Sequence, residues 1–217
     1  MDLLDLYNKC LNARYTTVEN NADYAYRQVG NRLYLFFQWT NSTEDWKNNF
    51  DFPAKPYKDM GELWFCHRGF LKVWKSIEPY LQEIVVRPTV KSIVIAGYSH
   101  GAAIAALCHE YCWFNRPDLR DKIEGYGFGA PRVFWGWFMS KKLKQRWENF
   151  HPVRNANDLV THVPPILFGF RHVNKVIKIG RKDELIVRKC KLSCIDAHRP
   201  ENYIDSLGIL NDDIKNE

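Results

Sequence analysis

The feature that most constrains this chain is a short polar segment, GYSHG at positions 97–101, set inside an otherwise apolar run. Residues 92–96 before it have the length and composition of a buried strand, and residues 102–114 after it begin with small side chains typical of a closely packed helix. A serine on such a turn holds strained backbone dihedrals, and a side chain two residues to either side would collide with neighbouring backbone. The glycines at 97 and 101 avoid that collision. We therefore predict that Ser99 is a nucleophile on a strand-to-helix elbow.

The predicted helix also prepares the chemistry at Ser99. Helix N-termini present N–H groups and the positive end of the helix dipole, here beside the serine oxygen. A serine hydroxyl is a poor nucleophile until a neighbouring base takes its proton. Folds with this elbow supply the partners later in the chain, in the order serine, acid, histidine.

The acid is expected on a loop just after a strand. Asp158 meets this condition, because it follows the apolar segment 150–153 and precedes a rigid Val-Pro-Pro at 163–165. The alternative is a turn aspartate of the Asx type beside Asn157. Given the serine, we interpret Asp158 as the acid.

Three histidines follow, and one of them is the expected base. His198 stands in a loop that opens the final predicted helix, where a chain-terminal base belongs. His162 lies only four residues after Asp158, too close to bridge acid and serine comfortably. His172 enters a strand and remains the alternative.

Strands and helices alternate through the middle of the chain. We expect helices over residues 2–12, 69–86, 102–114, 134–147 and 200–207, strands over 92–96, 123–128 and 150–154, hairpins within 24–37 and 173–187, and a loop over 40–66. Pro79 should kink or divide its helix. This order predicts an α/β fold, with a mostly parallel central sheet, helices on both faces and antiparallel strands near the ends. No repeat or linker divides residues 1–217, which predicts one domain.

The net charge of +6 is concentrated near residues 141–146 and 175–191. Neither region is a recognised nucleic-acid module or interleaves basic residues with stacking aromatics, so we expect no nucleic-acid partner. A solvated basic surface is the favoured interpretation, and non-specific attraction to anionic lipid headgroups is the alternative.

Residues 1–5 lack a basic region followed by an apolar stretch, and the apolar segment 128–139 is too short and too interrupted to span a bilayer. We therefore expect a cytoplasmic protein without a stable membrane anchor. The six cysteines include two Cys-x3-Cys pairs, 108/112 and 190/194. A zinc site is the alternative there, but the flanking ligand patterns are missing, so we expect reduced thiols, no metal and no cofactor.

Five segments occur in the order HRGFL at 67–71, GYSHG at 97–101, FGAPRV at 128–133, Asn157-Asp158 with the following Val-Pro-Pro, and His198 with Tyr203. By these segments the chain resembles, from about residue 33 to 203, the lipase class 3 family, the α/β-hydrolases that include small fungal triacylglycerol lipases. The resemblance implies a Ser99–Asp158–His198 triad and an oxyanion hole formed by Thr40 and the backbone N–H of His100. It also places a lid over residues 41–52.

Several positions depart from the family pattern. Gln38-Trp39 stands where the family has Arg-Gly, His100 replaces a common leucine, and Ala102 replaces a common glycine. The His100 side chain should point away from the serine oxygen. The tryptophans at 39, 46 and 64 either line an acyl groove or pack a loop-rich region. These departures bear on substrate shape, since the triad residue types are all present.

The expected function is that of a serine carboxylic-ester hydrolase that cleaves acyl esters, above all acylglycerols, through an acyl-enzyme. The expected partner is an acyl-ester or lipid substrate, with transient contact to a lipid interface. Three alternatives stay open: a phospholipase or short-chain esterase on the same triad, an acyltransferase or thioesterase, and a non-catalytic scaffold. The oligomeric state is not fixed by the sequence.

Overall fold

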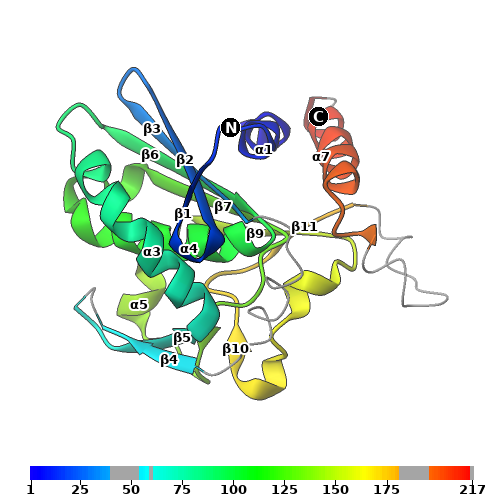
Figure 1. The fold of residues 1–217 in the computed structure, drawn as a ribbon. Helices are drawn as coiled ribbons and strands as arrows, with labels where there is room; N and C mark the ends of the chain where they lie inside the picture. The colour runs from blue at the N-terminus through cyan, green and yellow to red at the C-terminus, as the bar shows by residue number, and fades with distance from the viewer. Residues whose placement is uncertain (40–53, 59–60, 181–195, 216–217) are drawn as a thin grey trace.

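The computed structural model describes residues 1–39, 54–58, 61–180 and 196–215. Its larger sheet has seven strands in the order β1-β2-β3-β6-β7-β9-β11 (Figure 1). These are β1 (Thr16–Val18), β2 (Ala22–Val29), β3 (Arg32–Trp39), β6 (Ser92–Tyr98), β7 (Ile123–Phe128), β9 (Phe150–Asn155) and β11 (Ile177–Ile179).

The strand directions confirm the expected mixed sheet. β2 and β3 form an antiparallel hairpin that turns at Gly30-Asn31, and β1 extends it at the sheet edge. From β3 onward every neighbouring pair is parallel, through β6, β7 and β9 to β11. The carboxyl ends of these parallel strands therefore meet at one end of the sheet, where ligand sites of α/β folds lie.

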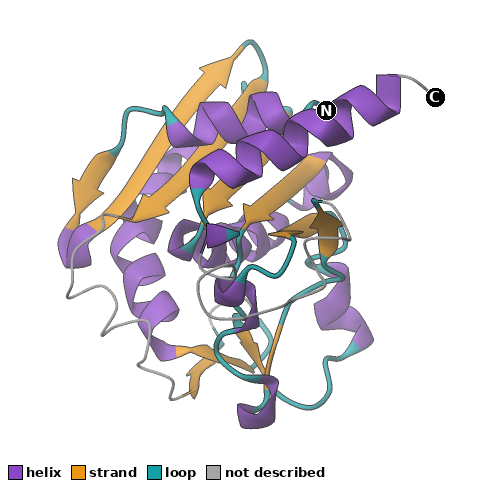
Figure 2. Ribbon diagram, turned by 90° about the vertical axis from the view of Figure 1, so that its right-hand side faces the viewer, coloured by secondary structure: helices purple, strands orange, loops and turns teal. Residues whose placement is uncertain are grey.

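Helices cover both faces of this sheet (Figure 2). On one face lie α3 (Arg68–Val85) and α4 (His100–Asn115), and on the other lie α1 (Leu3–Leu11) and α7 (Pro200–Lys215). The two helices of the second face run side by side, and the Asn211 amide donates to the Asp2 carboxylate at 2.8 Å. Together with the mostly parallel sheet, this arrangement is the predicted α/β architecture.

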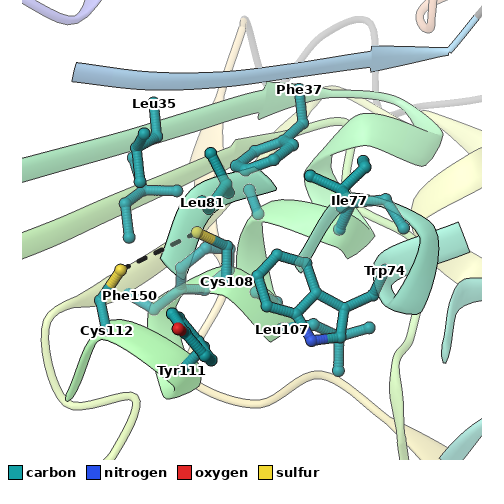
Figure 3. Close-up of a cluster of buried hydrophobic side chains, with 14 of the residues drawn as sticks. Leu35, Phe37, Trp74, Ile77, Leu81, Leu107, Cys108, Tyr111, Cys112 and Phe150 are labelled. Carbon is teal, nitrogen blue, oxygen red and sulfur yellow. Dashed lines mark hydrogen bonds between the residues drawn. The ribbon is translucent and has the colours of Figure 1, made fainter. Parts of the chain in front are cut away.

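Alternation along β3 divides the core between the two faces. Leu35 and Phe37 point toward α3 and α4, whereas Phe36 packs with α1 and α7. Figure 3 shows the first cluster, in which Phe37 packs edge-on against Trp74 of α3 with ring centroids 6.4 Å apart. Every residue of α4 from 100 to 112 is buried, which explains why its sequence is rich in alanine.

Cys108 and Cys112 lie within this core, with their sulfurs 3.9 Å apart (Figure 3). Within the described ranges, Cys10, Cys66, Cys108 and Cys112 are free and buried. The described residues also contain no group of three or more histidine, cysteine, aspartate or glutamate side chains that could hold a metal ion. The pair at 190 and 194 lies outside the described residues.

A second, antiparallel sheet, in the order β10-β8-β5-β4, lies below the first in the view of Figure 1 and contacts α3 through β4 and β5. Its strands are β4 (Ala54–Tyr57), β5 (Trp64–His67), β8 (Phe134–Trp135) and β10 (Phe170–Arg171). The short helices of the fold are α5 (Lys141–Gln145) and the 3-10 turns η1 (Glu19–Asn21), η2 (Pro117–Lys122), η3 (Leu159–His162) and η4 (Ile166–Phe168).

This second sheet overturns two predicted elements. The helix expected over 134–147 is wrong, because residues 134–135 pair with β5 and β10 and Gly136 has a φ of 146° that ends regular structure. Only α5 of that helix forms. The loop expected over 40–66 is wrong in its second part, which contributes β4 and β5; residues 40–53 lie outside the described ranges.

Three further elements differ in part from the prediction. Pro79 lies inside an uninterrupted α3, whose buried side chains hold it on both sides of the proline. Of the hairpin expected over 173–187, the described part is β11, which pairs parallel to β9; residues 181–195 are outside the described ranges. The last helix runs to Lys215, beyond the expected end at 207. In the part of the chain that the structure describes, none of the helices has both the length and the apolarity needed to cross a bilayer.

Candidate active site

The elbow between β6 and α4 holds Ser99 in a strained conformation. Its φ of 56° and ψ of −126° lie in a region that non-glycine residues rarely adopt. The backbone N–H of Ser99 donates to Phe128 O of β7 at 2.9 Å, and the N–H of Ala102 donates to Ser99 O at 3.0 Å. Such strain persists only when the surroundings fix it, and it raises the serine side chain above the sheet.

The two glycines of the elbow are required by close backbone approaches. A Cβ at Gly97 would lie 2.2 Å from Gly101 O, and a Cβ at Gly101 would lie 2.1 Å from Phe37 O of β3. Both distances are far below contact distance, so β3, β6 and α4 meet here with room for hydrogen only. The steric reason predicted for these glycines is confirmed.

Ser99, His198 and Asp158 form a continuous hydrogen-bonded chain. Ser99 Oγ lies 2.8 Å from His198 Nε2, and His198 Nδ1 lies 2.8 Å from Asp158 Oδ2. Because a carboxylate only accepts, Nδ1 carries the proton and Nε2 is left to accept from the serine hydroxyl. The structure therefore brings together the three side chains predicted from the sequence.

Asp158 is fully buried just beyond the end of β9 and accepts from two further donors. Its Oδ1 accepts from the Val160 N–H at 2.9 Å, and its Oδ2 also accepts from the Tyr203 hydroxyl at 2.7 Å. Burial, together with Asp158, raises the pKa of Tyr203 well above its usual range, so this hydroxyl remains a donor. The Tyr203 oxygen accepts in turn from the Asn155 N–H at 3.1 Å. These contacts fix the carboxylate that faces the imidazole.

The loop that carries His198 is held at several points. Asn155 donates its amide to Ala197 O at 3.0 Å and accepts from the Ser206 hydroxyl at 2.8 Å. Tyr98 donates its hydroxyl to His198 O, and its ring stacks on the imidazole with centroids 5.1 Å apart. The imidazole is therefore positioned from both its backbone and its ring face.

Glycine at 129 makes room for the same imidazole. Gly129 has a φ of 63°, and a Cβ there would lie 2.8 Å from His198 Cε1. Sequence reasoning did not assign a role at the site to Gly129, Tyr98 or Asn155. Tyr98 and Gly129 lie inside motifs that were recognised, but no sequence signal marks Asn155.

The other candidate histidines are engaged elsewhere. His172 Nε2 lies 2.9 Å from Thr161 O, and burial lowers the pKa of this imidazole to about 4. His162 Nε2 lies 3.0 Å from an Arg154 nitrogen. His198 is the histidine that reaches both Ser99 and Asp158.

His100 is the first residue of α4, directly after Ser99, so its backbone N–H belongs to the first turn of the helix. Its imidazole is buried against the Phe70 ring, with centroids 4.8 Å apart. Burial, with His67 close by, lowers the pKa of His100 well below its usual range. The side chain is thus a neutral part of the core between α3 and α4.

The remaining predictions about the site fall largely outside the described residues. Thr40, Trp46 and the segment 41–52 are not described, nor is the Trp39 side chain. Trp64 is described and is almost fully buried; its indole N–H donates to Glu110 at 3.1 Å and its ring stacks on Phe134. For Trp64, packing is therefore the correct interpretation.

Comparison with known proteins shows which family the chain matches. A model of the family described as lipase (class 3) matches residues 34–168, more than half of the chain. Similar proteins include a lipase of Rhizopus niveus, 31% identical over 68% of this chain and 39% of its own, and a secreted mono- and diacylglycerol lipase of Fusarium solani, 30% identical over 61% of this chain and 39% of its own. The chain thus spans less than half the length of these relatives.

Solved structures of low sequence identity share the fold. Lipase II from Rhizopus niveus superposes with a TM-score of 0.63 at 23% identity, over 76% of this chain and 64% of that one. The triacylglyceride lipase of Rhizomucor miehei gives 0.63 at 19% identity, over 78% and 66%. The α/β-hydrolase architecture expected from the sequence is confirmed.

The expected cytoplasmic location is wrong. Relatives from Fusarium solani, Penicillium cyclopium and Malassezia restricta are named secreted lipases, which points to an extracellular location. The expectation depended on the composition of residues 1–5, and in a chain that matches only part of its relatives those residues carry no information about export.

The match to the family, the shared fold and the assembled Ser99–His198–Asp158 geometry lead to one conclusion: this chain belongs to the class 3 lipase family.

Proposed function

We propose that the protein is a serine carboxylic-ester hydrolase that cleaves acylglycerols through a Ser99–His198–Asp158 triad. The observation that carries the proposal is the unbroken hydrogen-bonded chain from Ser99 Oγ through His198 to the buried Asp158. It supplies a nucleophile, a base and a group that orients the base, which together define acyl transfer.

In the first step, Ser99 Oγ attacks the acyl carbonyl carbon while His198 Nε2 takes the hydroxyl proton. Asp158 holds the imidazole in the required tautomer and stabilises its charged form. Collapse of the tetrahedral intermediate breaks the ester C–O bond. His198 then gives the proton to the departing alcohol, leaving an acyl group on Ser99.

In the second step, water attacks the acyl-enzyme and His198 accepts a proton from it, so that the carboxylic acid leaves and Ser99 regains its proton. In both steps negative charge develops on the carbonyl oxygen. We assign its stabilisation to the backbone N–H of His100, at the N-terminus of α4, and to Thr40 as the second donor.

Two considerations support acylglycerols as the substrate class. Several relatives of this chain are named mono- and diacylglycerol lipases. Large apolar side chains are also exposed on the molecule, including Leu159, directly after Asp158. The proposal therefore includes transient contact with a lipid interface, and it requires no metal or cofactor, since the triad alone supplies the nucleophile and the base.

The test compares wild type with Ser99→Ala on p-nitrophenyl esters from acetate to palmitate, and on mono-, di- and triolein and phosphatidylcholine. We expect Ser99→Ala to lower kcat by on the order of 10⁴-fold or more. Serine-dependent release of fatty acid from the oleins supports the proposal. If serine-dependent turnover were confined to phosphatidylcholine or to short esters, acylglycerols would not be the substrate class. Equal turnover by wild type and Ser99→Ala would refute the triad.

A further inference from the structure

The second sheet carries a group of exposed apolar side chains that the triad does not use. They come from β8, the residues just after it, and η4, and we name them the aromatic face: Trp135, Trp137, Phe138, Ile166, Leu167 and Phe168. Phe138 is 94% exposed and Leu167 is 84% exposed. Scattered apolar residues are normal on protein surfaces, but six exposed ones on two segments that are bonded to each other indicate contact with an apolar partner.

Hydrogen bonds and ring contacts hold the aromatic face together. The Trp135 indole donates to Phe168 O at 2.8 Å, and the Gly136 N–H donates to Gly169 O at 3.0 Å. Trp135 also packs edge-on against Phe65 of β5, with centroids 5.5 Å apart. The segments 135–138 and 166–168 are thus fastened to each other on a sheet, so their exposed side chains form a built surface.

This surface lies at the same end of the molecule as the triad. His67, the last residue of β5, stacks on Phe70, which in turn contacts the ring of His100 beside Ser99. Arg132 donates its backbone N–H to Val163 O at 2.8 Å and its guanidinium to Pro164 O at 2.9 Å. These contacts join the chain leading into β8 to the loop that runs from Asp158 to η4.

Basic side chains lie near the aromatic face, in space for Arg171 and along the chain for three lysines. Three exposed lysines, Lys141, Lys142 and Lys144, follow Phe138 within six residues, and the Arg171 guanidinium lies 5.7 Å from the Trp137 ring centroid. The whole chain carries a net charge of +6. Lysines beside exposed aromatic and leucine side chains are complementary to a surface with an apolar interior and negatively charged headgroups.

We propose that the aromatic face seats this protein on an anionic phospholipid surface. Phe138 and Leu167 insert between acyl chains, and Lys141, Lys142 and Lys144 lie among the headgroup phosphates. Nearly complete exposure favours this partner over a protein groove, because protruding side chains enter a fluid bilayer without needing matched pockets. The inference depends on the proposed function only in its purpose, since such seating would bring Ser99 to an ester at the surface.

The experiment measures co-sedimentation of Ser99→Ala protein with vesicles of phosphatidylcholine alone or mixed with phosphatidylglycerol. The Ser99→Ala background keeps the lipid intact. We expect binding to mixed vesicles that weakens with salt, and a loss of roughly tenfold or more per side chain in Phe138→Ser and Leu167→Ser. The triple variant Lys141→Gln, Lys142→Gln, Lys144→Gln should bind mixed vesicles no better than neutral ones.

The matched control is Val29→Ser with Val86→Ser, which removes two exposed apolar side chains near the amino ends of the parallel strands. This control should bind like the parent. The proposal would be overturned if the Phe138 and Leu167 variants bound vesicles as well as the parent does. It would also be overturned if the control lost as much binding as these variants. A parent that fails to bind vesicles but forms a dimer in light scattering, with the Phe138 and Leu167 variants monomeric, would overturn it as well; the face would then join two copies.

Failure of the inference and failure of the proposed function give different results. With Ser99 intact, Phe138→Ser and Leu167→Ser should keep wild-type turnover of dissolved p-nitrophenyl butyrate and wild-type unfolding by circular dichroism. Vesicle binding without serine-dependent ester turnover would refute the function and retain the surface. Serine-dependent ester turnover without vesicle binding would retain the proposed function and refute the role of the aromatic face.

Discussion

Tyr203 connects the buried acid to its surroundings through a single oxygen. Its hydroxyl donates to Asp158 Oδ2, the same atom that accepts from His198, and accepts from the Asn155 N–H. Two donors on one carboxylate oxygen fix the direction in which that oxygen faces the imidazole. Tyr203 thus acts on the reaction through Asp158 and is a positioning residue.

We predict that Tyr203→Phe lowers kcat on a soluble ester by about tenfold with little change in KM, because Asp158 loses one of the bonds that orient it. The buried Asn155 N–H would also lose its acceptor, which destabilises the fold by about 1–3 kcal/mol. Steady-state kinetics and urea unfolding measure the two effects. Tyr126→Phe, which removes a hydroxyl 3.3 Å from Glu124, is the control and should change neither.

At this scale the sequence predicted the side chains with distinctive surroundings. Ser99 lies between glycines, Asp158 lies before Val-Pro-Pro, and His198 opens the last helix. Asn155 could not be found in this way, because its role depends on a β9 residue meeting Ala197 and Ser206 in space. The catalytic roles of the triad residues and of His100 and Thr40 stay predictions until variants are measured.

At the scale of the elements, α4 is tightly constrained by its packing. It packs against β3, β6 and β7, and its N-terminus approaches β3 so closely that Gly101 has no room for a Cβ. The same approach places the first turn of the helix beside Ser99. Packing and chemistry therefore depend on one contact between the helix and the sheet.

We predict that Gly101→Ala lowers the free energy of unfolding by about 1–3 kcal/mol, because α4 must move away from Phe37 O. The matched control is Gly208→Ala in α7, where a Cβ would meet nothing within 4 Å. This control should stabilise the protein by about 0.5–1 kcal/mol, since alanine favours the helix. Denaturant midpoints of the two variants give the comparison, and equal midpoints would contradict the steric argument.

The sequence predicted the long buried elements well and the short ones poorly. The strands and helices of the large sheet carry enough apolar residues to show their period, as in α3 with Phe70, Trp74 and Ile77 on one side. Residues 134–138 are equally apolar, but a strand of two residues is too short to show a period. The conformation of β8 is fixed by pairing with Phe65 and Phe170, which lie far away in the sequence.

For the molecule as a whole, buried histidines couple folding to pH. His109 of α4 is almost fully buried against Phe150, and burial lowers its pKa from 6.5 to about 4. Between these values the unfolded chain binds a proton that the folded chain excludes. The free energy of unfolding is therefore unaffected by this histidine above about pH 6.5, and it decreases as the pH falls toward 4, because protonation of His109 favours the unfolded chain.

We predict that wild type loses up to roughly 3 kcal/mol of unfolding free energy relative to His109→Leu between pH 7 and pH 4. The comparison between the two proteins is needed because Glu110 acts in the opposite direction, since burial raises its pKa to about 7. Urea unfolding at several pH values provides the measurement. Parallel curves for the two proteins would show that His109 does not titrate differently on folding.

The packing of Tyr7 bears on how the protein is made. This residue of α1 contacts Tyr98 of the elbow, Phe128 at the end of β7 and Tyr203 of α7. During synthesis α1 is made nearly two hundred residues before α7. Until then the face of α1 that carries Tyr7 lacks its contact with α7. His198 takes its place only when α7 docks there. A nascent chain should therefore be inert toward esters until residues 200–215 have been made and α7 has docked, because the same contacts complete both the fold and the triad.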